Sequence, residues 1–118
     1  MITAKRIYDA RSPDDGYRVL VDRLWPRGIK REVAGIDHWA KAIAPSTDLR
    51  QWFDHRSERW PEFQVRYALE LVGAEAKAEL ERLEAIAATG NLTLLTATRS
   101  EEENHAVFLA SRLKADCS

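Results

Sequence analysis

The chain has a single cysteine, Cys117, so a disulfide framework and a cluster of thiol metal ligands are both excluded. No apolar run approaches the ~20 residues that a membrane-spanning helix needs. Residues 1–9 contain no apolar block of the signal-peptide type, and we therefore expect a cytoplasmic location. The nucleotide-binding and metal-binding patterns GxGxxG, GxxxxGK[ST] and HExxH are absent too. The sequence predicts no metal site and no bound cofactor.

What is present is the composition of an ordinary globular protein, with 118 residues, 45% hydrophobic and 31% charged. We expect a single domain over residues 1–118, because the chain has no repeat, no low-complexity segment and no Gly/Ser linker. The net charge of −1 hides an asymmetry: cations, mostly arginines, exceed acids in the first half, and acids exceed cations in the second. Arginine suits planar contacts with carboxylates and phosphates, so the two halves either pair with each other or bind an anion.

Three segments have the pattern of strands, namely residues 2–8, 17–21 and 91–98. Their continuous apolar centres, such as Val19 to Val21, are typical of strands covered on both faces. A fourth strand around residues 38–44 is less clear, because its spacing also suits a helix.

Four segments predict helices: residues 45–54, 57–72, 74–88 and 100–113. Ser57 is expected to cap the second of them, and Ser100 with Glu103 has the spacing of a capping box for the last. Strands interleaved with helices predict an α/β fold, with a small, mostly parallel sheet of three to four strands flanked by about four helices in a three-layer domain.

Charged and aromatic residues follow directly on the strand at residues 17–21. In open α/β sheets ligands bind beyond the carboxyl ends of the strands, which is the position of Asp22 and Arg23. These two neighbours point to opposite faces, so each needs another partner. Arg27 lies in the Pro/Gly turn that follows Trp25, and from there its guanidinium could bind an anion over the end of the strand. The alternative is a structural turn in which Trp25 seals the edge of the core.

Two further clusters compete with this one. Ser46, Thr47 and Arg50 lie at a predicted helix start, which is either a seat for phosphate or ordinary helix capping. The other cluster lies where the last strand passes into the last helix and consists of Thr96, Thr98, Arg99, Asn104 and His105. The three glutamates at 101–103 already place negative charge there, which disfavours an anion. His105 is then either a general acid or base near neutral pH or a structural histidine.

Several motifs together resemble the YeaO-like branch of the domain-of-unknown-function 488 proteins. They are YRVLVDRLWPRG at 17–28, APSTDLRQWF at 44–53, WPEF at 60–63 with Tyr67, LL at 94–95 and NHAV at 104–107. The resemblance implies a small cytoplasmic bacterial α/β protein from a family without an established activity. It also implies that one site is formed by Asp22, Arg23, Arg27, Ser46, Arg50, Asn104 and His105.

The chain departs from the wider family at two places. That family often has a Cys-His-Arg triplet where this chain has Asn104, His105 and Ala106, and a cysteine near the end of the preceding strand where this chain has threonines. Only His105 carries over, so thiol-based and metal-based chemistry inferred for the wider family is not expected here.

The leading hypothesis is a pocket at the carboxyl edge of the sheet for an anionic small molecule, a nucleotide or phosphorylated metabolite. Arginines 23, 27 and 50 would hold the anion, and Trp25 or Trp52 would stack on a ring. Asp22 and His105 would handle protons in a metal-independent hydrolysis or group transfer.

The main alternative is a non-catalytic module, either a ligand sensor or a protein-interaction domain such as a homodimer, because four tryptophans are many for this length. It predicts that Trp39 and Trp52 lie together on an open surface. Binding of nucleic acid is a weaker alternative, since the chain as a whole is not basic.

Overall fold

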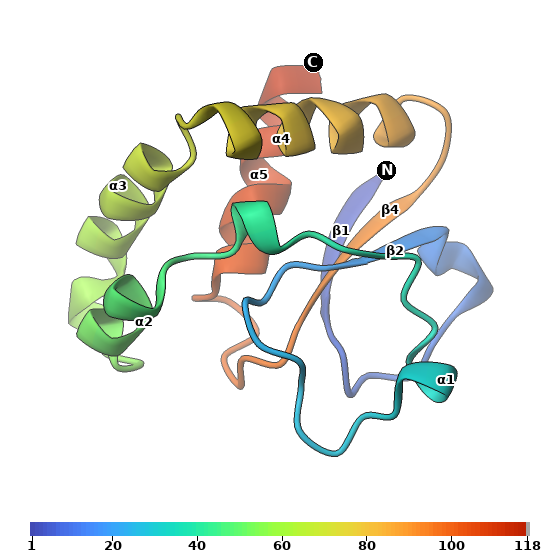
Figure 1. The fold of residues 1–118 in the computed structure, drawn as a ribbon, viewed down its shortest axis with the longest axis horizontal. Helices are drawn as coiled ribbons and strands as arrows, with labels where there is room; N and C mark the ends of the chain where they lie inside the picture. The colour runs from blue at the N-terminus through green and yellow to red at the C-terminus, as the bar shows by residue number, and fades with distance from the viewer. Residues whose placement is uncertain (118) are drawn as a thin grey trace.

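The computed structural model describes residues 1–117, with side chains described as far as residue 114. Within these residues four parallel strands form one sheet in the order β1-β4-β2-β3, of which β1, β4 and β2 are labelled in Figure 1. The strands are β1 (Ile2–Arg6), β2 (Tyr17–Leu20), β3 (His38–Trp39) and β4 (Leu92–Thr96). Every residue of β4 is buried, as the apolar centre of its sequence predicts for a strand between two others.

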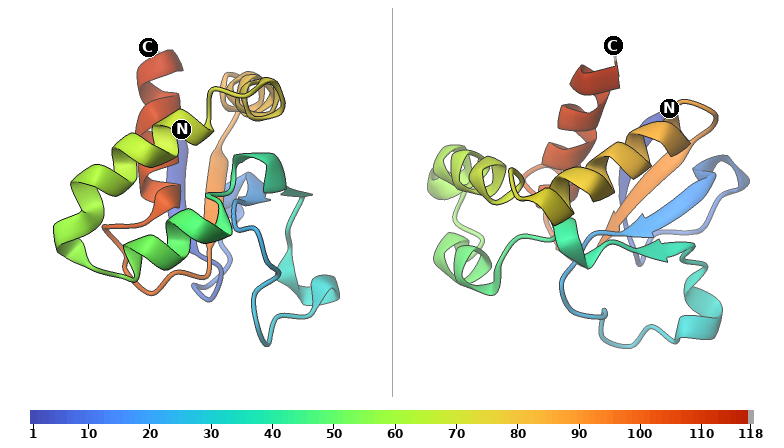
Figure 2. Two further views of the ribbon diagram at one scale, coloured as in Figure 1. Left: turned by 60° about the vertical axis from the view of Figure 1, so that its left-hand side comes forward. Right: turned by 45° about the horizontal axis from the view of Figure 1, so that its top comes forward.

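In the described part of the chain five α-helices accompany the sheet: α1 (Arg31–Ala34), α2 (Thr47–Phe53), α3 (Trp60–Glu70), α4 (Ala74–Ala87) and α5 (His105–Cys117). Short 3₁₀ turns lie at Pro13–Asp15, Lys41–Ile43 and Ser57–Arg59. Helices α3, α4 and α5 stand on one side of the sheet and one-turn α1 on the other (Figure 2). The expected α/β fold with a small parallel sheet is confirmed. No helix among the described residues is long and apolar enough to cross a membrane.

The alternation of side chains along the strands divides the core in two. Val19 and Leu94 face the helices and join the larger cluster, which includes Phe63 and Tyr67 of α3. Leu20 and Leu95 face the other way into a smaller cluster, beneath the long loop that connects β2 to β3. The sheet is thus covered by a thick helical layer and by a thin layer of loop with α1.

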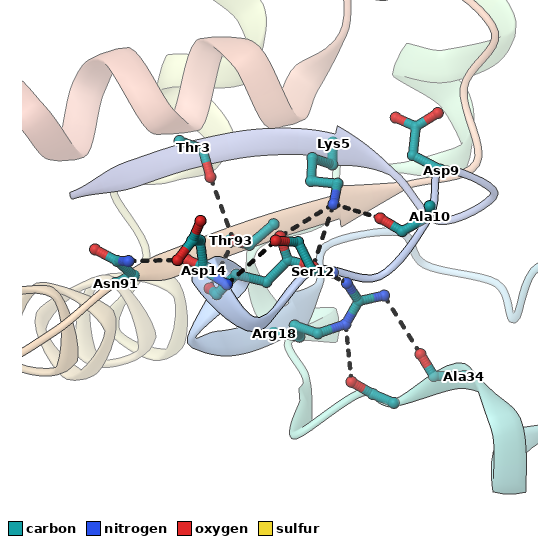
Figure 3. Close-up of polar contacts among 12 residues, drawn as sticks. Thr3, Lys5, Asp9, Ala10, Ser12, Asp14, Arg18, Ala34, Asn91 and Thr93 are labelled. Atoms are coloured by element: carbon teal, nitrogen blue, oxygen red, sulfur yellow. Dashed lines mark hydrogen bonds and ion pairs between the residues drawn. The ribbon is translucent and has the colours of Figure 1, made fainter.

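On the side of the sheet that is covered by loops, hydrogen bonds and ion pairs between charged side chains hold the loops in place (Figure 3). Asp15 accepts hydrogen bonds from Lys5 at 3.0 Å and from Arg18, whose Nε donates to the Gly35 carbonyl at 3.0 Å. Burial alone would raise the pKa of Asp15, but the Ser12 amide and the two cations lower it below the usual value. These side chains are fully occupied with one another, which makes the cluster structural.

Two helix starts differ from the sequence-based prediction. The last helix begins at His105 rather than at residue 100, and the second long helix begins at Trp60 after a 3₁₀ turn rather than at Ser57. Ser57 does not cap that helix; its hydroxyl donates to Glu103 at 2.6 Å. The weak strand at 38–44 is only two residues long, because a 3₁₀ turn follows at Lys41–Ile43.

Candidate functional site

The carboxyl edge of the sheet brings together two residues that are distant in sequence. Asp22 follows β2 and is 2% exposed, and His105 opens α5 and is 4% exposed. His105 Nε2 lies 2.8 Å from Asp22 Oδ1. Because a carboxylate only accepts hydrogen bonds, this imidazole nitrogen carries the proton.

Asp22 is held from three directions. Besides His105, the hydroxyl of Thr96 donates to Oδ1 at 2.7 Å and the backbone N–H of Ala97 donates to Oδ2 at 2.8 Å. Burial by itself would raise the pKa of Asp22. The hydrogen bond and charge of His105, with the Ala97 and Thr96 bonds, outweigh burial and lower this pKa. Asp22 is therefore an ionised carboxylate that fixes the orientation of the His105 ring.

Helix α5 places His105 by means of its N-cap. Asn104 Oδ1 accepts from the Val107 amide at 2.9 Å, and Asn104 Nδ2 donates to the Ser100 carbonyl at 2.7 Å. The ring of His105 packs edge-on against Tyr67 of α3, with 6.2 Å between ring centroids. The first turn of α5 thus directs its positive dipole end towards the carboxyl edge of the sheet.

A cleft of about 290 Å³ opens above this pair. Helix α2 supplies one wall and the segment from β4 to α5 supplies another. The lining residues are Arg23, Leu24, Thr47, Arg50, Gln51, Phe53, His55, Phe63, Thr98, Glu103, Asn104 and His105. Asp22 lies beneath the cleft and reaches it through His105.

Two arginines give the cleft its positive charge. Arg23 donates from Nε to the Pro45 carbonyl at 3.3 Å and from Nη2 to the Ala44 carbonyl at 3.1 Å, which ties the end of β2 to the start of α2. Arg50 on α2 is exposed, and its guanidinium forms no hydrogen bond or ion pair with the other described residues. The one carboxylate among the lining residues, Glu103, accepts the hydrogen bond from Ser57.

Four of the sequence-predicted binding residues are absent from this lining. Trp25 packs on Trp39 in the smaller core, with 5.3 Å between ring centroids, and donates from Nε1 to the Ile29 carbonyl at 2.6 Å. Arg27 and Arg99 are exposed elsewhere. Ser46 caps α2 and donates from Oγ to Glu70 at 2.6 Å, so its hydroxyl serves the helix start.

The cleft also contains residues that sequence analysis did not single out as site residues. The most notable is His55, which follows the C-cap residue of α2, while Phe53 and Phe63 supply apolar surface. A histidine that follows a helix end has no recognisable spacing relative to Asp22 or His105, so no motif marks it. Its position depends on how α2 packs against α3.

The arrangement can do two things chemically. Arg50, together with Arg23, can hold an anion. His105, oriented by a buried carboxylate, has the geometry of a general base or acid. These residues come from segments after β2, in α2 and in α5, so the site depends on the fold of the whole sheet edge.

The parallel sheet and its edge cleft define a small α/β protein. The chain belongs to the family described as the inactive DUF488-N3 subclade, whose model matches residues 1–118. The uncharacterized protein YeaO of Escherichia coli (strain K12) is 44% identical over 114 residues, which are 97% of each chain. The uncharacterized protein Rv3073c of Mycobacterium tuberculosis (strain ATCC 25618 / H37Rv) is 44% identical over 114 residues, 95% of this chain and 92% of that one. No solved structure matches significantly. The resemblance to the YeaO-like branch is confirmed.

Proposed function

We propose that the protein binds an anionic small molecule, a nucleotide or phosphorylated metabolite, in the carboxyl-edge cleft. Arg50 carries this proposal, because it lines the cleft and its guanidinium has no hydrogen-bond or ion-pair partner among the described residues. Arg23 adds to the attraction, and Glu103 is the one acidic side chain among the described residues of the lining. An exposed arginine in a concave site is free to meet a phosphate with paired N–H donors.

The size of the cleft and the residues that line it limit the kinds of ligand that fit. Ligand sites commonly measure about 300–1,000 Å³, and 290 Å³ is just below that range. Phe53 and Phe63 offer apolar surface to a ring, beside the polar groups of Thr47 and Gln51. These features favour a molecule no larger than a mononucleotide, with one anionic end and one ring.

A binding screen with two matched arginine variants tests the proposal. Nucleoside monophosphates and sugar phosphates are tested by thermal shift, and the hits are titrated calorimetrically. We expect Arg50→Ala to weaken binding at least about tenfold, because a charge-assisted hydrogen bond contributes about 1.5–3 kcal/mol. Arg27→Ala removes an equally exposed arginine from outside the cleft and should leave the affinity unchanged. Equal losses in both variants, or no hit with wild type, would refute the proposal.

Turnover is the second candidate, and the Asp22–His105 pair is the observation that favours it. His105 would take a proton from a water molecule, and the oxygen of that water would attack the phosphorus of the bound ester. The P–O bond to the alcohol would break, and the alcohol would leave with the proton from the imidazolium, which the buried carboxylate stabilises until then. The description of the family as inactive favours binding without reaction. Phosphorus NMR of each hit separates the two: product that forms with wild type and not with His105→Gln would establish catalysis.

The protein-interaction alternative has little support from the tryptophans. Trp39 packs in the smaller core, and Lys41 Nζ lies 3.9 Å from its ring centroid. Trp52 packs against the larger core, and the guanidinium of Arg66 lies 4.2 Å from its ring centroid. The two rings therefore belong to different faces of the sheet, which does not favour a shared aromatic interface.

A further inference from the structure

We infer that His55 is a ligand-contacting residue of the cleft and that, together with Arg23 and Arg50, it selects a phosphoryl group over a carboxylate. The inference rests on the proposed function, because it concerns the ligand of the same cleft. His55 and the two arginines line that cleft from three segments: the turn after α2, the end of β2 and α2 itself.

The backbone at the end of α2 is the first observation. Asp54 has φ of 48° and His55 has φ of 55°, so two consecutive residues with a Cβ adopt the left-handed conformation. Asp54 is the C-cap of α2, and its N–H donates to the Arg50 carbonyl at 3.1 Å. One left-handed residue is the usual end of a helix, and glycine is the usual choice because it has no Cβ to clash. Here the conformation occurs twice without glycine.

The side chains at these two positions differ in where they lie. Asp54 is mostly exposed, with its carboxylate 3.8 Å from Nε of Arg56, and it does not line the cleft. His55 does line the cleft. Glycine at position 55 would relieve the backbone but would remove the imidazole from the cleft. Strained residues of this kind cluster at ligand sites, which points to a role for the ring rather than for the turn.

The number of donors points to the chemical class. A carboxylate has two oxygens and one charge, and the unpaired guanidinium of Arg50 alone can satisfy it. A phosphoryl group has three terminal oxygens and a charge near −2 at neutral pH. Nη1 of Arg23 has no hydrogen-bond partner among the described residues, and together with the His55 ring it offers donors for the third oxygen and the second charge.

Two probes with the same ring and different anions test this selection. Phenyl phosphate and benzoate are titrated by ligand-observed NMR into wild type, His55→Gly and Asp54→Gly. We expect wild type to prefer phenyl phosphate and His55→Gly to lose about tenfold in that affinity, with little change for benzoate. The Asp54→Gly variant relieves the same turn without touching the cleft, and both of its affinities should equal those of wild type.

The outcomes separate the inference from the proposed function. If Arg50→Ala loses phenyl phosphate while His55→Gly binds it as wild type does, the role of His55 is overturned and anion binding stands. If wild type binds neither probe, the role of His55 and anion binding in the cleft are both refuted. Thermal unfolding of each variant shows whether it is folded. Should His55→Gly fail to fold, His55→Asp replaces it, because aspartate tolerates the left-handed conformation and repels the phosphate; unchanged affinity in that variant also overturns the inference.

Discussion

Asp22 accepts hydrogen bonds from Thr96 and Ala97 at the end of β4 and from His105 at the start of α5, while it is itself 2% exposed. Asparagine has the same size but cannot reproduce this, because its NH2 group replaces one accepting oxygen and faces at least the Ala97 N–H, which also donates. We expect Asp22→Asn to lower the free energy of unfolding by about 3 kcal/mol, because it leaves a buried donor without its acceptor. Urea unfolding followed by tryptophan fluorescence measures it.

The matched control is Asp48→Asn, which makes the same change at an exposed position of α2. It should cost less than about 1 kcal/mol. Equal costs at the two positions would show that the three hydrogen bonds of Asp22 contribute no more to stability than a surface acid does.

The lowered pKa of Asp22 also predicts how stability depends on pH. Its folded-state pKa lies below the ordinary value of 3.8, so its contribution is present above that value and is lost as pH falls through the folded pKa. Between about pH 5 and pH 2 the unfolding free energy of wild type should therefore fall more steeply than that of Asp22→Asn. Asp15 also has a lowered pKa, so some acid dependence should remain in the variant. Parallel curves for the two proteins would contradict the assignment.

At the scale of elements, the start of α5 depends on Asn104. We expect Asn104→Ala to lower the unfolding free energy by about 1 kcal/mol, because it removes the cap of the Val107 amide. Asn104→Asp keeps an accepting oxygen and should recover part of this. Ser100→Ala should cost less, because its hydroxyl serves only the turn that precedes the helix. Urea unfolding of the three variants ranks them, and a larger loss in Ser100→Ala would place the helix start where the sequence pattern expected it.

Helix α5 begins at His105 rather than at the predicted residue 100, and this difference shows what local sequence can and cannot predict. The first half of the capping pattern forms as expected: the Glu103 amide donates to Ser100 Oγ at 3.1 Å. The second half does not, because the Glu103 carboxylate accepts instead from Ser57, 46 residues away. The pattern therefore closes a single turn. Strand centres and α4 were predictable because their periodicity is decided within the segment, whereas this choice depends on tertiary packing.

The candidate site divides in the same way. The sequence placed Asp22, Arg23, Arg50 and His105 at strand ends and helix starts, and the structure brings these four together at one edge. The same reasoning also proposed Trp25, which packs in the smaller core, and Arg27, which lies outside the cleft. Periodicity identifies which face a regular element buries, but it does not give the direction in which an irregular turn projects its side chains.

At the scale of the whole molecule, the two covers of the sheet are unequal. The helical side buries a large cluster that includes α3, α4 and α5, whereas the loop side rests on Ile7, Leu20 and Leu95 under Trp25 and Trp39. The candidate cleft belongs to the helical side, between α2, α3 and the start of α5. Ligand binding should accordingly involve the well-packed side and leave the loop layer unaffected.

Because the two sides of the sheet are covered unequally, we expect local unfolding to require less free energy on the loop side than on the helical side. We expect amide hydrogen exchange to show the highest protection in β4, which is buried throughout, and lower protection in residues 29–37, where fewer apolar contacts must be broken. Trp25→Ala removes the ring that packs on Trp39 and should lower protection of residues 29–37 further. Protection in α5 should change little, because its apolar side packs in the other cluster. If Trp25→Ala instead lowers protection equally in β4, α5 and the loop, then the two sides of the sheet unfold as one cooperative unit.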